Sequence, residues 1–183
     1  LFTILAVCAA LFALPCSALT LKFTNENPDF STSNAYVMFR SGVADPFVAN
    51  YSGGPVALTT AYSFAQLSGG VTLSNITVGV LYISLGKPMS VPVTNVSGAL
   101  PEPSASNPVD ADYSTRWDTV EITFNGLSYD AANLTGINKF AIPFRLLTLN
   151  GATNKASFGY HVDGVTMISN LHDAATDDSA ILE

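Results

Sequence analysis

Residues 116–125 read Arg-Trp-Asp-Thr-Val-Glu-Ile-Thr-Phe-Asn, and their pattern indicates the fold class. Apolar and polar side chains alternate along it with a period of two, as they do in a β-strand with one buried face. The buried face is expected to carry Val120, Ile122 and Phe124. The opposite face then carries Trp117, Thr119, Glu121 and Thr123. We therefore expect an indole and a carboxylate on the same side of a sheet.

This outward face has two interpretations. A flat ring can stack on a sugar, and a carboxylate can exchange a proton with a glycosidic oxygen. Alternatively, it is an ordinary solvated strand face with one partly exposed Trp, since antiparallel sheets commonly leave one side to water. The strand by itself leaves both interpretations open.

Short apolar or alternating runs, separated by Gly, Pro, Asn and Ser, extend the β pattern over most of the chain. We predict strands at residues 19–24, 35–40, 78–85, 117–125, 137–147 and 157–162. Both faces of 78–85 are largely apolar, so this strand is expected to lie between two layers. No long amphipathic helix is evident before the last dozen residues, where Thr176 is a candidate N-cap. Strand after strand without intervening helices predicts an all-β sandwich or barrel.

The first 18 residues carry no charge, are almost wholly apolar and end at the small residue Ala18. This pattern is typical of a secretory signal peptide cleaved before Leu19, and it predicts an extracellular or cell-wall location. A membrane anchor is the alternative, but the run is short for a span and contains Pro15. We expect no membrane span in the mature chain.

Both cysteines, Cys8 and Cys16, lie in this leader, so the mature chain is expected to contain no disulfide. Residues 19–172 are then expected to form one β domain. Residues 173–183 are expected to begin a helix or a truncated second region.

Charge narrows the class of partner. The 183 residues have a formal net charge of −7, only 11% are charged, and no basic cluster is present. Such a chain is a poor partner for nucleic acid, and a neutral polysaccharide suits it better. His161 and His172 have no Cys or carboxylate at metal-ligand spacing, so we expect neither a metal nor another cofactor.

Three segments have a familiar order. Residues 110–113 read Asp-Ala-Asp-Tyr, residues 116–125 form the strand described above, and residues 134–143 read Leu-Thr-Gly-Ile-Asn-Lys-Phe-Ala-Ile-Pro. This order resembles the secreted β-1,3-glucanases of glycoside hydrolase family 64. There, an aspartate-containing loop leads into a strand with a catalytic Glu, and a later strand of the type Thr-x-Val-Asp-Phe-Phe-x-x-Pro carries a second carboxylate. The resemblance implies a thaumatin-like β-sandwich or barrel that acts on β-1,3-glucan or a related polysaccharide.

The same resemblance assigns the catalytic positions. Glu121 matches the first carboxylate, expected to be the general acid, whereas the second position is Asn138 instead of Asp. An inverting glycosidase needs an acid for the leaving oxygen and a carboxylate to activate water. An amide orients water but cannot accept its proton. Asp118 faces away from Glu121 by strand parity, so Asp130 is the better substitute. Asn138 is alternatively a strand-end amide that satisfies local backbone groups.

Two functions follow for testing. The first is a secreted, inverting hydrolase of β-1,3-glucan, impaired by the Asn at the second carboxylate position. Its substrate contacts are expected from Trp117, Thr119, Thr123 and Asp130. The alternative is a non-catalytic carbohydrate-binding or structural cell-wall protein with the same β-sandwich fold.

Overall fold

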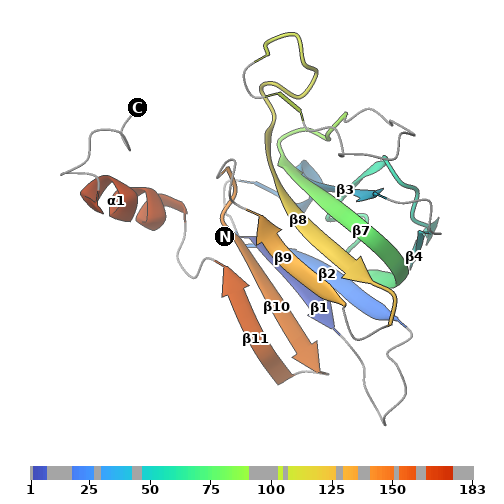
Figure 1. Ribbon diagram of the computed structural model, residues 1–183. Helices are drawn as coiled ribbons and strands as arrows, with labels where there is room; N and C mark the ends of the chain where they lie inside the picture. Colours follow the sequence, from blue (N-terminus) through green and yellow to red (C-terminus); the bar gives the residue numbers. More distant parts are fainter. Residues whose placement is uncertain are drawn as a thin grey trace.

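The computed structural model describes residues 2–7, 18–26, 30–42, 47–90, 103–104, 107–126, 130–135, 141–150, 153–159 and 164–174. Nearly all regular structure in these residues is β (Figure 1). The strands are β1 (Phe2–Val7), β2 (Leu19–Asn25), β3 (Ala35–Ser41), β4 (Val48–Tyr51), β5 (Gly54–Pro55), β6 (Ala61–Ser63), β7 (Val71–Leu85), β8 (Arg116–Phe124), β9 (Ala131–Thr135), β10 (Phe144–Asn150) and β11 (Thr153–Gly159). A 3-10 turn, η1, spans Thr32–Asn34, and the helix α1 spans Gly164–Ala174.

The long strand β7 links two layers. Residues 71–75 pair with β2 and β4, and residues 79–85 pair with β3 and β8. Between these halves the register shifts, and Val78 adopts a φ of 48°. A bulge of this kind bends a strand, which allows one strand to contribute to two sheets. The first layer continues through β2, β1, β10 and β11, and the second contains β6, β3, β8 and β9.

The main core lies between these two layers. Phe23 of β2 and Phe39 of β3 meet edge to face, with ring centroids 6.3 Å apart. Val120, Ile122 and Phe124 of β8 are all buried in the same cluster. Burial of each such side chain stabilises the fold by roughly 1.5–3 kcal/mol. The expected inward face of β8 and the all-β class are therefore confirmed.

The expected strand bounds are most accurate where apolar and polar residues alternate in the sequence. β2, β3 and β8 lie within about one residue of the expected bounds, and residues 81–85 of β7 are buried on both faces, as expected. The expected strand 137–147 is wrong at its start: residues 141–143 are not in a strand, and β10 begins at Phe144. Pro143 explains this, because it has no backbone N–H to give to a ladder. Residues 136–140 lie outside the described part.

Further elements differ from the sequence expectation. β1, β4, β5 and β6 are strands that it does not include, and β7 begins at Val71, seven residues before the expected strand 78–85. β9 was not expected, and β11 begins four residues before the expected strand 157–162, whose last three residues lie outside the described part. α1, of 11 residues, begins before the last dozen residues, where the sequence shows no long amphipathic helix. Its apolar residues Met167, Ile168 and Leu171 have helical spacing in the sequence, which is the signal for this helix. The expected N-cap Thr176 lies outside the described residues.

The first strand falls inside the expected leader. β1 pairs antiparallel with β2 and parallel with β10. Cleavage before Leu19 would remove this strand from the sheet, and the leader stays a prediction. Cys8 and Cys16 lie outside the described residues. Among the described helical residues, no segment has the length and apolar character needed to cross a membrane.

Candidate functional site

The second layer presents Glu121 on its outer face. Glu121 lies directly opposite Val80 of β7 and Asn133 of β9. Paired residues in an antiparallel ladder project to the same side, so these three side chains form one row across the sheet. Thr123 lies one step further along β8, opposite Ala131, and Thr119 lies one step back, opposite Tyr82.

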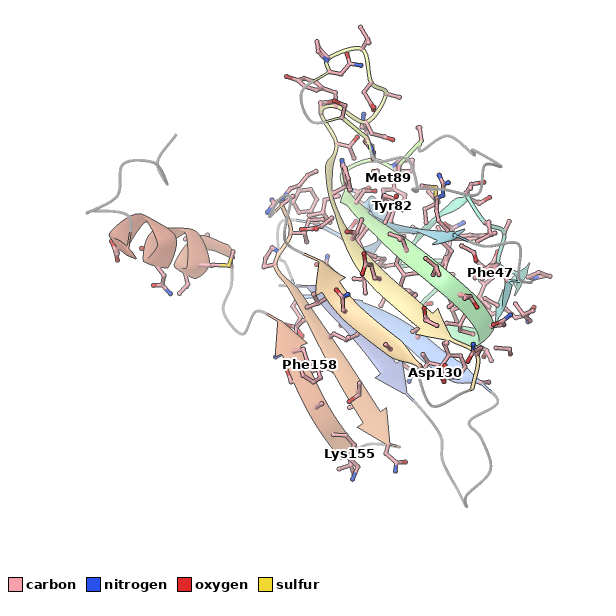
Figure 2. The ribbon with its side chains drawn as sticks, in the orientation of Figure 1. Phe47, Tyr82, Met89, Asp130, Lys155 and Phe158 are labelled. Carbon is pink, nitrogen blue, oxygen red and sulfur yellow. The ribbon has the colours of Figure 1, made fainter. Side chains whose placement is uncertain are left out.

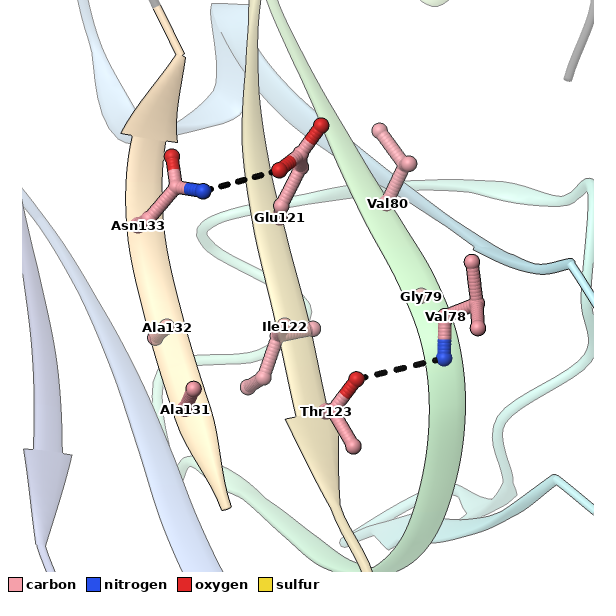
Figure 3. A pocket seen from close by; sticks show the side chains of 9 residues that line it. All are labelled: Val78, Gly79, Val80, Glu121, Ile122, Thr123, Ala131, Ala132 and Asn133. Atoms are coloured by element: carbon pink, nitrogen blue, oxygen red, sulfur yellow. Dashed lines mark hydrogen bonds between the residues drawn. The ribbon is translucent and has the colours of Figure 1, made fainter. Parts of the chain in front are cut away.

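An open depression of about 270 Å³ follows this row (Figure 3). It is lined by Val78, Gly79, Val80, Glu121, Ile122, Thr123, Ala131, Ala132 and Asn133. Three of these residues, Gly79, Ala131 and Ala132, have little or no side chain. At Gly79, an added Cβ would lie 2.3 Å from Cδ1 of Ile76 and 2.9 Å from the carbonyl oxygen of Ile122, so no larger residue fits.

Two hydrogen bonds join residues that line the depression. Oε2 of the exposed Glu121 accepts a hydrogen bond of 2.8 Å from Nδ2 of Asn133. Oγ1 of Thr123 accepts one of 3.3 Å from the backbone N–H of Val78. The structure therefore brings Glu121 and Thr123 into one depression, with Thr119 half-buried beside it. Asn133 was not singled out from the sequence, because β9 itself was not expected.

Trp117 has the expected parity but not the expected exposure. Only 4% of it is exposed, and its ring centroid lies 5.8 Å from that of Tyr82. It belongs to a second buried cluster with Met38, Tyr82 and Met89. Figure 2 shows Tyr82 and Met89 at the upper end of β7. The expectation of an exposed indole is wrong, because the segment after β7 covers this end of the face. A ring packed in this way leaves no free side for a sugar.

Asp130 lies at the opposite end of the sheet from Tyr82 and Met89 (Figure 2). Its Oδ1 accepts the backbone N–H of Asn125 at 2.8 Å, and its Oδ2 accepts that of Gly126 at 3.1 Å. Both oxygens therefore close the turn between β8 and β9. The geometry gives Asp130 a role in holding this turn, and it adds no support for Asp130 as a second catalytic carboxylate.

Asp118 faces away from Glu121, as expected, and it holds a distant segment. The carboxylate is buried, and its Oδ2 accepts the backbone N–H groups of Ala141 and Ile142 at 3.2 and 3.3 Å. Arg116 donates from Nε to the carbonyl oxygen of Ala141 at 2.7 Å. Asp118 and Arg116 of β8 thus hold residues 141 and 142 in place through backbone hydrogen bonds. Asn138 lies in the undescribed segment 136–140, so its position relative to Glu121 stays a prediction.

The Asp-Ala-Asp-Tyr motif builds the loop before β8. Asp110 accepts the backbone N–H groups of Ser104 and Asp112 at 3.0 and 2.8 Å. These hydrogen bonds hold the pKa of the Asp110 carboxyl below its usual value. Asp112 is buried and accepts the backbone N–H of Ser90 at 2.8 Å, which ties the loop to the segment after β7. The motif therefore organises the cover over the Trp117 cluster.

Metal-ligating side chains do not gather in the described part of the chain, where no three of His, Cys, Asp and Glu lie close enough to hold an ion. His161 and the side chain of His172 lie outside that part. The polar side chains that line the depression are one carboxylate, one amide and one hydroxyl, from Glu121, Asn133 and Thr123.

Comparison with solved structures shows the same fold in longer proteins. A β-1,3-glucanase domain (GH64) from Clostridium beijerinckii is 16% identical, with a TM-score of 0.62 over 97% of this chain and 50% of that one. A GH family 64 laminaripentaose-producing β-1,3-glucanase from Paenibacillus barengoltzii is 14% identical, with a TM-score of 0.58 over 95% of this chain and 43% of that one. It has also been solved in complex with laminarihexaose. This chain thus spans about half the length of these relatives or less.

At the level of sequence, no curated protein matches this chain. The profile of the β-1,3-glucanase family, glycoside hydrolase family 64, matches residues 20–181. That match covers both layers of the sheet, the depression around Glu121 and the loop before β8. The chain therefore belongs to glycoside hydrolase family 64.

Proposed function

We propose that this chain contributes Glu121 as the general acid of a secreted, inverting hydrolase of β-1,3-glucan. The observation that carries the proposal is the exposed Glu121 carboxylate in an open depression, on the strand where the family resemblance puts a catalytic acid. The Paenibacillus relative is a β-1,3-glucanase solved with laminarihexaose, which supports the same class of substrate here.

The chemistry needs two groups on opposite sides of the sugar. Protonated Glu121 gives its proton to the glycosidic oxygen as the bond to the anomeric carbon breaks. A water molecule attacks that carbon from the other face and loses a proton to a base. Asn138 cannot accept that proton, so bulk water or a group from another part of the protein must do so. Turnover by the chain as it stands is therefore expected to be weak.

The second candidate function is a non-catalytic glucan-binding or cell-wall protein. The observation that favours it is the amide at position 138, where the family pattern has a carboxylate. Loss of the base removes turnover but leaves the groups that bind sugar hydroxyls. Activity on glucan separates the two functions.

The experiment is laminarin hydrolysis and binding by the full chain and three variants. We expect Glu121→Gln to abolish cleavage and to keep binding, because the change preserves shape and removes the titrating proton. We expect Asn138→Asp to raise turnover, since general-base assistance is worth about 10²–10⁴-fold. Glu26→Gln is the matched control, because Glu26 is exposed and pairs with Arg145 instead of a depression residue.

Three outcomes separate the interpretations. Strong wild-type cleavage that is indifferent to Glu121→Gln would place the catalytic acid elsewhere. Glucan binding without cleavage in any variant would support the binding protein. Neither binding nor cleavage in any variant would remove both proposals.

We further propose secretion with cleavage of the leader before Leu19, and N-terminal sequencing of protein from the medium tests it.

A further inference from the structure

The Glu121 carboxylate has one side-chain hydrogen-bond partner among the described residues, Asn133. Nδ2 of Asn133 donates to its Oε2 at 2.8 Å, and both side chains are exposed at the edge of the depression. Figure 3 shows the amide and the carboxyl group pointing toward one another across β8 and β9. Among the described residues, no other side chain hydrogen-bonds to this carboxylate. The amide is therefore the group on this face that directly orients Glu121.

The sheet itself builds this contact. Asn133 is the direct ladder partner of Glu121, so their Cβ atoms are held about 5 Å apart by backbone pairing. Leu134, next along β9, packs against the main core and keeps Asn133 on the outer face. Ala131, the partner of Thr123 on the same face, is small and leaves space beside the amide unfilled. The amide consequently has both a fixed backbone position and room to turn.

An amide is suited to a partner that changes its protonation state. Its NH₂ group donates to a carboxylate, and its carbonyl oxygen accepts from a protonated carboxyl group. Turning the Asn side chain about its last torsion exchanges these two arrangements, and that torsion is broad and nearly two-fold. A general acid passes through both states in each turnover. Asn133 can thus keep Glu121 in place before and after proton transfer.

We propose that Asn133 is a positioning residue that holds Glu121 in both of its protonation states. The inference rests on the proposed role of Glu121, because only a group that gives up its proton during turnover needs such a partner. Asn133 itself touches the acid and is not required to touch the sugar.

Two variants test the proposal by different physical effects. Asn133→Asp keeps the shape and puts a second carboxylate beside Glu121, which makes ionisation of Glu121 harder. A general acid works while protonated, so the alkaline limb of the pH–activity profile should move upward by about one pH unit or more. Asn133→Leu removes the donor, and we expect it to lower kcat about tenfold with KM changed less than about twofold. Asn50→Asp, at an exposed position of β4, makes the same charge change away from Glu121 and should leave the profile unchanged.

A second measurement needs no turnover. The chain has four Glu residues, at positions 26, 102, 121 and 183, so ¹³C NMR can follow each side-chain carboxyl and the Glu121→Gln variant assigns the Glu121 signal. We expect the Glu121 titration midpoint to be higher in Asn133→Asp than in Asn50→Asp, because only the first variant puts a like charge beside Glu121. Unfolding curves establish that each variant is folded.

The outcomes of this inference differ from those of the proposed function. Equal Glu121 midpoints in Asn133→Asp and Asn50→Asp would overturn the inference, whether or not laminarin is cleaved. An unchanged kcat in a cleaving, folded Asn133→Leu would also overturn it. Full activity in Glu121→Gln, by contrast, would overturn the proposed role of Glu121 whatever the titration shows.

Discussion

Asp118 shows how one side chain can join distant parts of this chain. Its buried carboxylate accepts backbone N–H groups from Thr119, Ala141 and Ile142. Hydrogen bonds to an ionised acceptor are stronger than neutral ones, and a buried donor left without an acceptor costs about 1–3 kcal/mol. An Asp at an inward position of an otherwise apolar strand face was the available signal in the sequence. Only the structure shows that its partners lie 23 and 24 residues further along the chain.

We expect Asp118→Asn to lower the free energy of unfolding by about 2–4 kcal/mol. The amide has one acceptor oxygen in place of two, and its NH₂ group then faces backbone donors. Urea unfolding of the two proteins measures the difference. The control is Glu26→Gln, which removes an exposed ion pair with Arg145 and should cost less than about 1 kcal/mol. Equal losses in the two variants would mean that Asp118 does not hold the Ala141–Ile142 segment.

At the scale of elements, the bulge in β7 joins the two layers and borders the depression. Val78 lies in this bulge with a φ of 48°, in the left-handed region that β-branched residues rarely adopt. Val78 is 56% exposed, so burial of its side chain contributes little stability to offset this backbone strain. The backbone N–H of Val78 nevertheless bonds to Thr123, which ties the bulge to β8.

We expect Val78→Asn to raise the free energy of unfolding by about 1 kcal/mol, because Asn tolerates left-handed backbone angles and the N–H of residue 78 is kept. Thermal unfolding of wild type and variant measures the change. Val48→Asn is the matched control, since Val48 is also exposed but lies in β4 without a positive φ. It should be destabilising by up to about 1 kcal/mol, because Asn is disfavoured in strands. A loss in both variants would show that strain at Val78 is not significant.

At the scale of the whole molecule, the expected leader and the sheet overlap. β1 lies between β2 and β10, within the segment that the apolar pattern marks for cleavage. We expect secreted protein to begin at Leu19, because signal peptidase acts on the small residue at Ala18 before the domain folds. Intact mass and N-terminal sequencing measure this. Replacing Ala18 by Tyr should block cleavage, and a wild-type protein that retains residues 1–18 would contradict the prediction.

Much of this molecule follows from the sequence by itself. The alternation in residues 116–125 determined that β8 is a strand and which side chains face the core, because its period matches the pleat. The order of three short motifs indicated the family, which the family profile confirms, whereas the role of Glu121 stays a prediction. The parity of Trp117 was also correct, since parity depends on neighbours in the chain alone.

Tertiary structure decided what covers each face and what each polar group meets. Trp117 is buried because a segment from elsewhere in the chain packs over it, and alternation contains no information about such a cover. β9 forms because pairing with β8 outweighs the weak strand preference of its Ala, Ala and Asn residues. That pairing brings Asn133 to Glu121, and the hydrogen bonds of Asp118 likewise depend on where remote backbone lies. The period-two alternation in the sequence specifies on which face of a strand each side chain lies. Only the folded chain specifies which groups that side chain contacts.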